Sequence, residues 1–233
     1  MKKPLLPLFL LALAICAWAA DFWTKPPDQW SDKDVQKMMT NSPWAREFTI
    51  SIPPMGAVDF GGGGPTGGRG GGGGGDLGGG GGPPGSTNVQ QMAPTVIARW
   101  QSALPIKQAF VRIKFGPNAG SPEAKQVLEK ADTEYVIVLS GNLRRMLMGP
   151  SAGLKKPILE ASSLNVKGKD PVKATDLDIA LEKDANDMVF HFPRTAPFTA
   201  DDKEVEFDTK FGNTAIKFKF HPKEMMYSGK LEM

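Results

Sequence analysis

The two histidines, His191 and His221, are the side chains of this sequence best suited to move protons near neutral pH. They stand far apart, and neither belongs to an HExxH motif or to a pair with metal-ligand spacing. His191 alternates with Phe190 and Phe192, which is typical of a strand that turns its aromatic residues toward a core, so we expect the imidazole on the solvent side. We expect structural roles for both histidines and predict no metal site.

The sequence also offers no nucleophile next to a base. Ser140-Gly141 follows an apolar run, but the residues before it do not fit the GxSxG elbow. The single cysteine, Cys16, lies in the N-terminal segment, so the remaining chain has no thiol for a cysteine–histidine pair. We therefore predict no catalytic serine or cysteine.

Paired carboxylates are the remaining route to hydrolysis, as in glycosidases. Two acidic groups are candidates, one around a predicted turn and one near the C-terminal end: Asp176, Asp178, Glu182, Asp184 and Asp187, and then Asp201, Asp202, Glu204, Glu206 and Asp208. The last three of these acids alternate with apolar residues on a predicted hairpin and face basic residues of the other strand, so a structural role explains them. An exported hydrolase that uses two carboxylates stays open as an alternative function.

Residues 56–85 hold 19 of the 27 glycines of the chain. The tract matches a loose GxGxxG, but no helix pattern follows it and it has no lysine for a phosphate loop, so no cofactor is predicted. Gly71 to Asp76 resembles half of a calcium-binding nonapeptide repeat, yet Leu77 stands one position too early. With almost no side chains to bury, the tract is expected to form a disordered loop.

Composition and charge limit the class of protein. Of 233 residues, 40% are hydrophobic and 23% are charged, as in folded soluble proteins. The formal net charge of +3 argues against a nucleic-acid binder, and one cysteine excludes a disulfide scaffold.

The first residues have the features of an export signal. Lys2 and Lys3 precede an apolar run from Leu5 to Ile15, and Ala17 and Ala19 supply the small residues that a signal peptidase reads. We expect residues 1–19 to be removed and the protein to be periplasmic or extracellular. A spanning helix needs about 20 apolar residues, which this segment lacks. Loss of the two lysines lowers the formal charge to +1, so no steering toward DNA or anionic lipid is expected.

A lipid anchor is the alternative for this segment. Leu13-Ala14-Ile15-Cys16 resembles a bacterial lipobox, in which Cys16 would carry the lipid. Ile15 departs from that pattern, because the residue before the cysteine is normally small. Membrane contact is expected only if Cys16 is lipidated.

The segment before the glycine tract predicts a helix and a strand. Ser31 is a good N-cap, Val35, Met38 and Met39 share one helical face, and the helix should end near Asn41. Residues 47–52 alternate as a strand does. Residues 20–55 are too few to fold alone, so we expect them to dock on a main domain of residues 86–233. The tract would then be an insertion between two neighbouring strands.

The later chain predicts an α+β fold. Helices are expected over residues 106–115 and from the Ser121 cap to about residue 131, and strands over 95–104, 135–139, 157–167, 174–182 and 187–193. The expected architecture is a mainly antiparallel sheet that carries an N-terminal helix and a few short helices.

The clearest local pattern is a hairpin over residues 203–221 around a Gly212-Asn213 turn. Folding about this turn pairs the residues as follows: Asp208 with Lys217, Glu206 with Lys219, Glu204 with His221, Phe207 with Phe218, and Val205 with Phe220.

Three tryptophans, Trp23, Trp30 and Trp44, flank the first predicted helix. Exposed aromatic rings can bind sugars or proteins, whereas buried rings would fix the helix to the domain. We expect the second role.

The segment DFWTKPPDQWSDKDVQKMMTNSPWA, with RWQSALPI and DDKEVEFDTKFG, resembles hypothetical secreted proteins that are common in soil bacteria of the acidobacterial type. That family has no known activity, so the resemblance implies no catalytic or binding residues. Together these observations predict a non-catalytic binding or structural component of the bacterial envelope, with a protein or glycan as its partner.

Overall fold

The computed structural model describes residues 21–49, 95–130, 132–141, 143, 153–181 and 186–233. These residues form antiparallel sheets and helices, so the predicted α+β class is confirmed. The five-stranded sheet has the order β1-β2-β3-β7-β6 and the four-stranded sheet the order β5-β4-β8-β9. The strands of these two sheets are β1 (Ala45–Thr49), β2 (Thr95–Trp100), β3 (Glu134–Gly141), β4 (Ser163–Asn165), β5 (Val172–Lys173), β6 (Asp176–Leu181), β7 (Asn186–Pro193), β8 (Val205–Phe211) and β9 (Thr214–Phe220).

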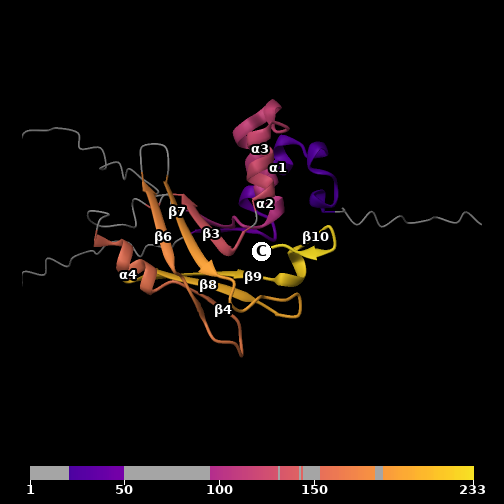
Figure 1. The fold of residues 1–233 in the computed structure, drawn as a ribbon. Helices are drawn as coiled ribbons and strands as arrows, with labels where there is room; N and C mark the ends of the chain where they lie inside the picture. The colour runs from indigo at the N-terminus through magenta and orange to yellow at the C-terminus, as the bar shows by residue number, and fades with distance from the viewer. Residues whose placement is uncertain (1–20, 50–94, 131, 142, 144–152, 182–185) are drawn as a thin grey trace, which may run out of the picture.

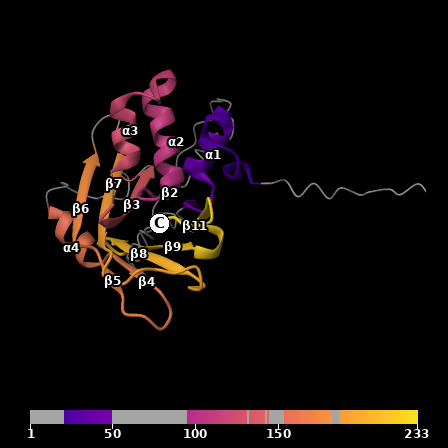
Figure 2. The ribbon, with the colours of Figure 1, turned by 45° about the vertical axis from the view of Figure 1, so that its right-hand side comes forward.

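The helices and a small two-stranded ladder complete the described fold. They are α1 (Asp32–Thr40), α2 (Leu104–Phe115), α3 (Pro122–Glu129), α4 (Lys155–Glu160), β10 (Met226–Tyr227) and β11 (Lys230–Leu231). Helices α1, α2 and α3 gather at one end of the molecule, while α4 lies beside β6 (Figures 1 and 2).

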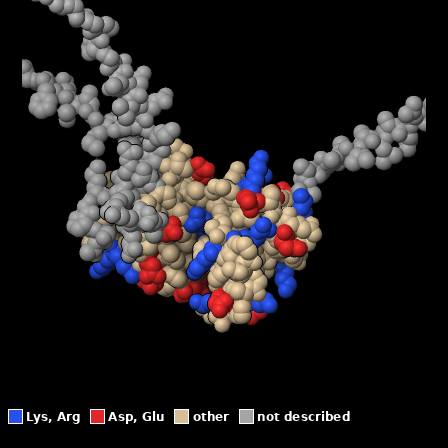
Figure 3. Space-filling model, turned by 90° about the horizontal axis from the view of Figure 1, so that it is seen from above, with Lys and Arg blue, Asp and Glu red and all other residues tan. Residues whose placement is uncertain are grey.

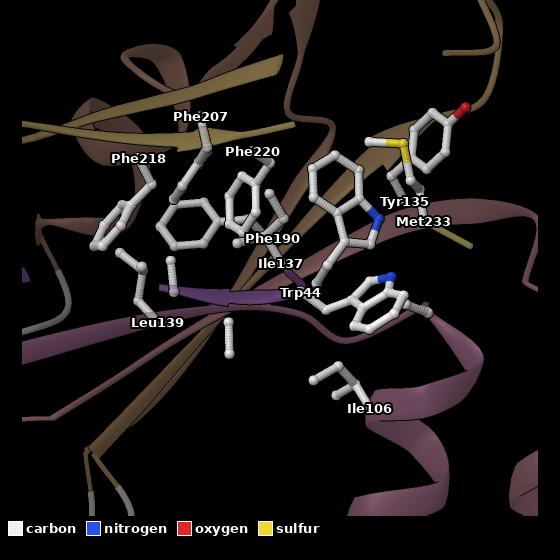
Figure 4. Packing of buried hydrophobic residues seen from close by; sticks show 14 of the residues in the cluster. Trp44, Ile106, Tyr135, Ile137, Leu139, Phe190, Phe207, Phe218, Phe220 and Met233 are labelled. Atoms are coloured by element: carbon white, nitrogen blue, oxygen red, sulfur yellow. The ribbon is translucent and has the colours of Figure 1, made fainter. Parts of the chain in front are cut away.

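The two larger sheets face each other with their strands crossing steeply (Figures 1 and 2). Aromatic rings fill the space between them: the ring centroid of Phe207 lies 5.1 Å from that of Phe190 and 5.9 Å from that of Phe192. Figure 4 shows Phe207, Phe218 and Phe220 projecting into the same interior as Leu139. The core is therefore shared by both sheets.

Local sequence explains how the helices begin. The Ser31 hydroxyl accepts from the backbone N–H of Asp34, whose carboxylate accepts from the N–H of Ser31, so both sides of a capping box are present. Asn41 is the C-cap of α1, as predicted. The predicted Ser121 cap is confirmed too, since its hydroxyl accepts from the N–H of Ala124.

The predicted hairpin is confirmed in its turn and in most of its register. Strands β8 and β9 pair Asp208 with Lys217, Glu206 with Lys219, Phe207 with Phe218, and Val205 with Phe220. Strands β1 and β2, which flank the glycine tract in the sequence, are also neighbours and pair Thr49 with Thr95. The tract itself lies outside the described residues.

The expected strand over 157–167 is wrong in its first half. Residues Lys155–Glu160 form α4, and only Ser163–Asn165 form a strand, β4. Pro157 falls in the first turn of the helix, where a missing N–H costs nothing. Strand β2 also ends at Trp100, earlier than expected, because Pro105 stands in the first turn of α2 rather than after a strand.

Residues 21–49 pack into the same core as the later chain. Phe22, Trp30, Val35 and Met38 are buried in one hydrophobic cluster with side chains of both sheets. The indole N–H of Trp44 donates to the carbonyl of Glu232 at 2.8 Å. The start and the end of the described chain are thereby joined.

Gly141 at the end of β3 permits the close pairing of β2 with β3. Its φ is 127°, and a Cβ at this position would collide with the backbone carbonyl oxygen of Thr95. We expect Gly141→Ala to lower the free energy of unfolding by about 2 kcal/mol, because neither backbone strand can give way.

Gly120→Ala is the matched control, since an added Cβ there meets nothing within 4 Å. Urea unfolding of the two variants measures the difference. Equal midpoints for both variants would contradict the assigned contact at Gly141.

Candidate functional site

Several predicted site residues lie outside the described residues. They are the signal-cleavage residues Ala17 and Ala19 and the lipidation candidate Cys16. Within the described part of the chain, no helix combines the length and apolar character that a membrane crossing requires.

His191 lies on the outer face of the five-stranded sheet, with its side chain 25% exposed. Its Nδ1 is 3.0 Å from a carboxylate oxygen of Glu134 on β3, and its Nε2 is 3.6 Å from a carboxylate oxygen of Asp178 on β6. The two carboxylates approach opposite ring nitrogens, so they cannot converge on one metal ion with the imidazole. Within the described residues, no set of three or more His, Cys, Asp or Glu side chains is placed to hold a metal.

The predicted pair of Glu204 with His221 is not formed, because the ladder ends one residue earlier in the same register. The Nδ1 of His221 lies 3.2 Å from the carbonyl oxygen of Lys203, and the Glu204 carboxylate instead binds Lys219 at 2.9 Å. The ladder ends with the pair of Val205 and Phe220, so the next residues are no longer held opposite each other. The longer lysine side chain reaches the carboxylate diagonally.

Three strands bring together a polar cluster that sequence analysis missed. Ser140 on β3 accepts a hydrogen bond from the guanidinium of Arg99 on β2 and donates one to Asp187 on β7. Burial lowers the pKa of Arg99, and the nearby Asp187 carboxylate partly opposes this change. Ser140 therefore bridges a largely buried cation and its counter-ion.

This cluster is not a serine–histidine catalytic site. Ser140 pairs with Asp187 across β3 and β7, whereas His191 pairs with Val136. Four residues along a strand correspond to about 13 Å. A proton cannot pass directly between Ser140 and His191 over that distance.

Glu206 and Asp208 form a carboxylate pair on the outer face of the four-stranded sheet. The Lys217 ammonium binds both, with Nζ 2.7 Å from Glu206 and 2.9 Å from Asp208. Hydrogen bonding to Lys217 lowers the pKa of Glu206. Burial raises the pKa of Asp208, helped by the negative charge of Glu206, and the Asp208 Oδ1 atom is buried without a hydrogen-bond partner.

A cavity at the N-terminal end of the described chain is the strongest candidate for a ligand site. This N-terminal pocket has a volume of about 660 Å³ and is lined by Asp21, Trp23, Thr24, Lys37, Asn41, Ser42, Pro43, Arg46, Lys223, Glu224 and Met226. Its walls come from α1, from β1 with the turn before it, and from the segment after β9. It combines one indole with hydroxyl, amide, carboxylate and cationic groups.

The three tryptophans have different environments. Trp30 and Trp44 are buried, which confirms the predicted stapling role for these two. Trp23 is only partly buried: its ring packs edge to face on Phe22 at 5.0 Å and on Trp44 at 5.8 Å, and it also lines the N-terminal pocket. Trp23 is thus fixed by the core and still reachable from the cavity.

A larger cavity of about 910 Å³ lies beside Glu206, between the turn after β4 and residues 201–204. The Lys169 ammonium and the Asp202 carboxylate join the two loops at 2.7 Å. None of the described residues that line this cavity is aromatic, and its acids and lysines are mixed. It therefore lacks the aromatic wall that Trp23 gives the N-terminal pocket.

Comparison of the chain with protein-family models, with curated proteins and with solved structures finds no match.

The Lys217 contacts predict a pH-dependent stability. Because the pKa of Lys217 is raised to about 12, its contribution is present at neutral pH and is lost as the pH rises through that value. Because the pKa of Glu206 is lowered from 4.5, its contribution is present above 4.5 and is lost as the pH falls through the lowered value. We expect Lys217→Gln to cost at most about 1 kcal/mol at pH 7, since these groups are partly exposed.

The stability difference between wild type and Lys217→Gln should shrink below pH 4.5, where the carboxylates take up protons. Melting temperatures of wild type and variant between pH 3 and pH 7 measure it. Lys210→Gln on the same hairpin, whose lysine is exposed, is the control. A constant difference between Lys217→Gln and wild type over this pH range would show that the pair does not act through charge.

Proposed function

We propose that this protein is an exported, non-catalytic binding component of the bacterial envelope, and that it binds a glycan in the N-terminal pocket. The observation that carries the proposal is the position of Trp23, whose ring is anchored on Phe22 and Trp44 and lines a cavity rimmed by polar side chains. The N-terminal sequence of residues 1–19 is the basis for export.

The chemistry of the pocket suits a sugar. A pyranose has one face of C–H groups, which packs on an aromatic ring, and a rim of hydroxyls, which both donate and accept hydrogen bonds. The Thr24 hydroxyl donates to the carbonyl of Asp21 and can accept from a sugar hydroxyl, and the Asn41 amide can both donate and accept. Asp21 adds a carboxylate acceptor.

The pocket is held by the core of the protein, which favours binding without large rearrangement. Ser42 and Pro43 in its wall are buried, and the Ser42 hydroxyl donates to the carbonyl of Met38 at 2.8 Å. Arg46 on β1 is fixed by an ion pair with Glu224 at 2.9 Å. A preorganised site loses less conformational entropy when the ligand binds.

A hydrolase is the second candidate, and the opposite pKa shifts of Glu206 and Asp208 favour it, since an acid and a base need such a separation. Lys217 lies between the two carboxylates, however, and binds both of them. Release of reducing ends from the sugars that bind, abolished by Glu206→Gln, would establish the hydrolase. The binding proposal predicts no such release.

Removal of the aromatic ring tests the binding proposal. Trp23→Leu keeps an apolar side chain against Phe22 and Trp44 but removes the flat face. We expect it to weaken binding roughly fivefold, because an aromatic contact of this kind contributes about 1 kcal/mol. Isothermal titration with cellohexaose, chitohexaose and hexagalacturonate measures the affinity.

Phe48→Leu is the matched control, since Phe48 is a 43% exposed aromatic residue of β1 that does not line the pocket. It should bind as wild type does. The proposal fails if none of the three sugars binds to the wild-type protein, or if Trp23→Leu binds as tightly as wild type.

A further inference from the structure

The proposed glycan site has a charge preference, which depends on that proposed function being correct. We infer that the N-terminal pocket selects anionic sugars, that is, glycans that carry carboxylate, sulfate or phosphate groups. The basis is the set of three cations in its wall: Lys37 on α1, Arg46 on β1 and Lys223 after β9.

The cations differ in how far they are neutralised. Arg46 already pairs with Glu224 at 2.9 Å, so this pair adds little net charge. Among the described residues, neither Lys37 nor Lys223 has a carboxylate within ion-pair distance. Asp21 is the other acid of the wall, so two unpaired ammonium groups stand against one carboxylate.

The local excess of positive charge contrasts with the lining of the cavity beside Glu206. Over the helical end of the molecule, acidic and basic side chains are interspersed (Figure 3). The cavity beside Glu206 is lined by four acids and only two lysines, so its lining carries more negative than positive side chains. In the N-terminal pocket the two lysines instead come from opposite ends of the chain and meet at one cavity.

Trp23 and the two lysines would bind different parts of the sugar. Trp23 contacts the apolar face of the sugar, and an ammonium group donates charge-assisted hydrogen bonds to its anionic substituent. Lys37 lies 5.7 Å from the ring centroid of Phe22, the residue that also supports Trp23. One cation is therefore held near the aromatic wall, where a substituent of a stacked sugar would lie.

Titration of wild type with hexagalacturonate, dextran sulfate and neutral cellohexaose tests the inference. At low salt we expect the two anionic probes to bind about tenfold more tightly than cellohexaose. The advantage should fall in 0.5 M salt, where charges are screened over roughly 4 Å. The double variant Lys37→Gln with Lys223→Gln should bind the anionic probes as weakly as the neutral one. The control is Lys125→Gln with Lys156→Gln, which removes the same charge on α3 and α4 and should bind as wild type does.

The outcomes separate this inference from the proposed function. Equal affinity for cellohexaose and hexagalacturonate would overturn the charge preference and leave glycan binding in place. Undiminished binding of anionic probes by the Lys37→Gln and Lys223→Gln double variant would also overturn it. If no sugar binds wild type, both proposals are wrong. Tighter binding of dextran sulfate than of hexagalacturonate would identify sulfate or phosphate, rather than carboxylate, as the preferred anion and would support the inference.

Discussion

Trp44 joins the two ends of the described chain. Its indole N–H donates to the carbonyl of Glu232, a partner 188 positions later, and its ring packs edge to face on Tyr227 at 6.2 Å. The carboxylate of Glu232 in turn accepts from the N–H of Leu104 at the start of α2. A helix of this length gains from an anion at its N-terminus. Trp44 and Glu232 together thus position β1, the C-terminal segment and the start of α2 relative to one another.

The candidate pocket follows from this junction. Trp23 packs edge to face on Trp44 from one side, and the segment with Lys223 and Glu224 reaches β1 from the other, where Glu224 binds Arg46. No part of the chain taken alone contains the walls of the cavity. If residues 21–49 did not dock, Trp23 would have no support and the cations of the pocket would not meet. The proposed function therefore depends on the packing of the N-terminal segment.

Local patterns predicted the elements well, and long-range geometry was harder to predict. The hairpin of β8 and β9 was predicted because alternation, a Gly-Asn turn and opposite charges all agree on one register. The pairing of β1 with β2 followed from the argument that residues 20–55 cannot fold alone. The strand expected over 157–167 was wrong because an apolar run with a proline also suits a first helical turn. The N-terminal pocket and the Arg99–Ser140–Asp187 cluster bring together residues that are distant in the sequence. Contacts of this kind cannot be predicted from local sequence patterns.

The most direct test of the central claim is to cut the chain between β1 and β2 under native conditions. A protease site placed within residues 70–75 of the glycine tract would leave the described elements intact. If residues 21–49 are part of the shared core, the two fragments should co-elute on gel filtration and melt in one transition. Fragments that separate, with a later portion that retains its own cooperative melt, would contradict the account and remove the basis for the N-terminal pocket.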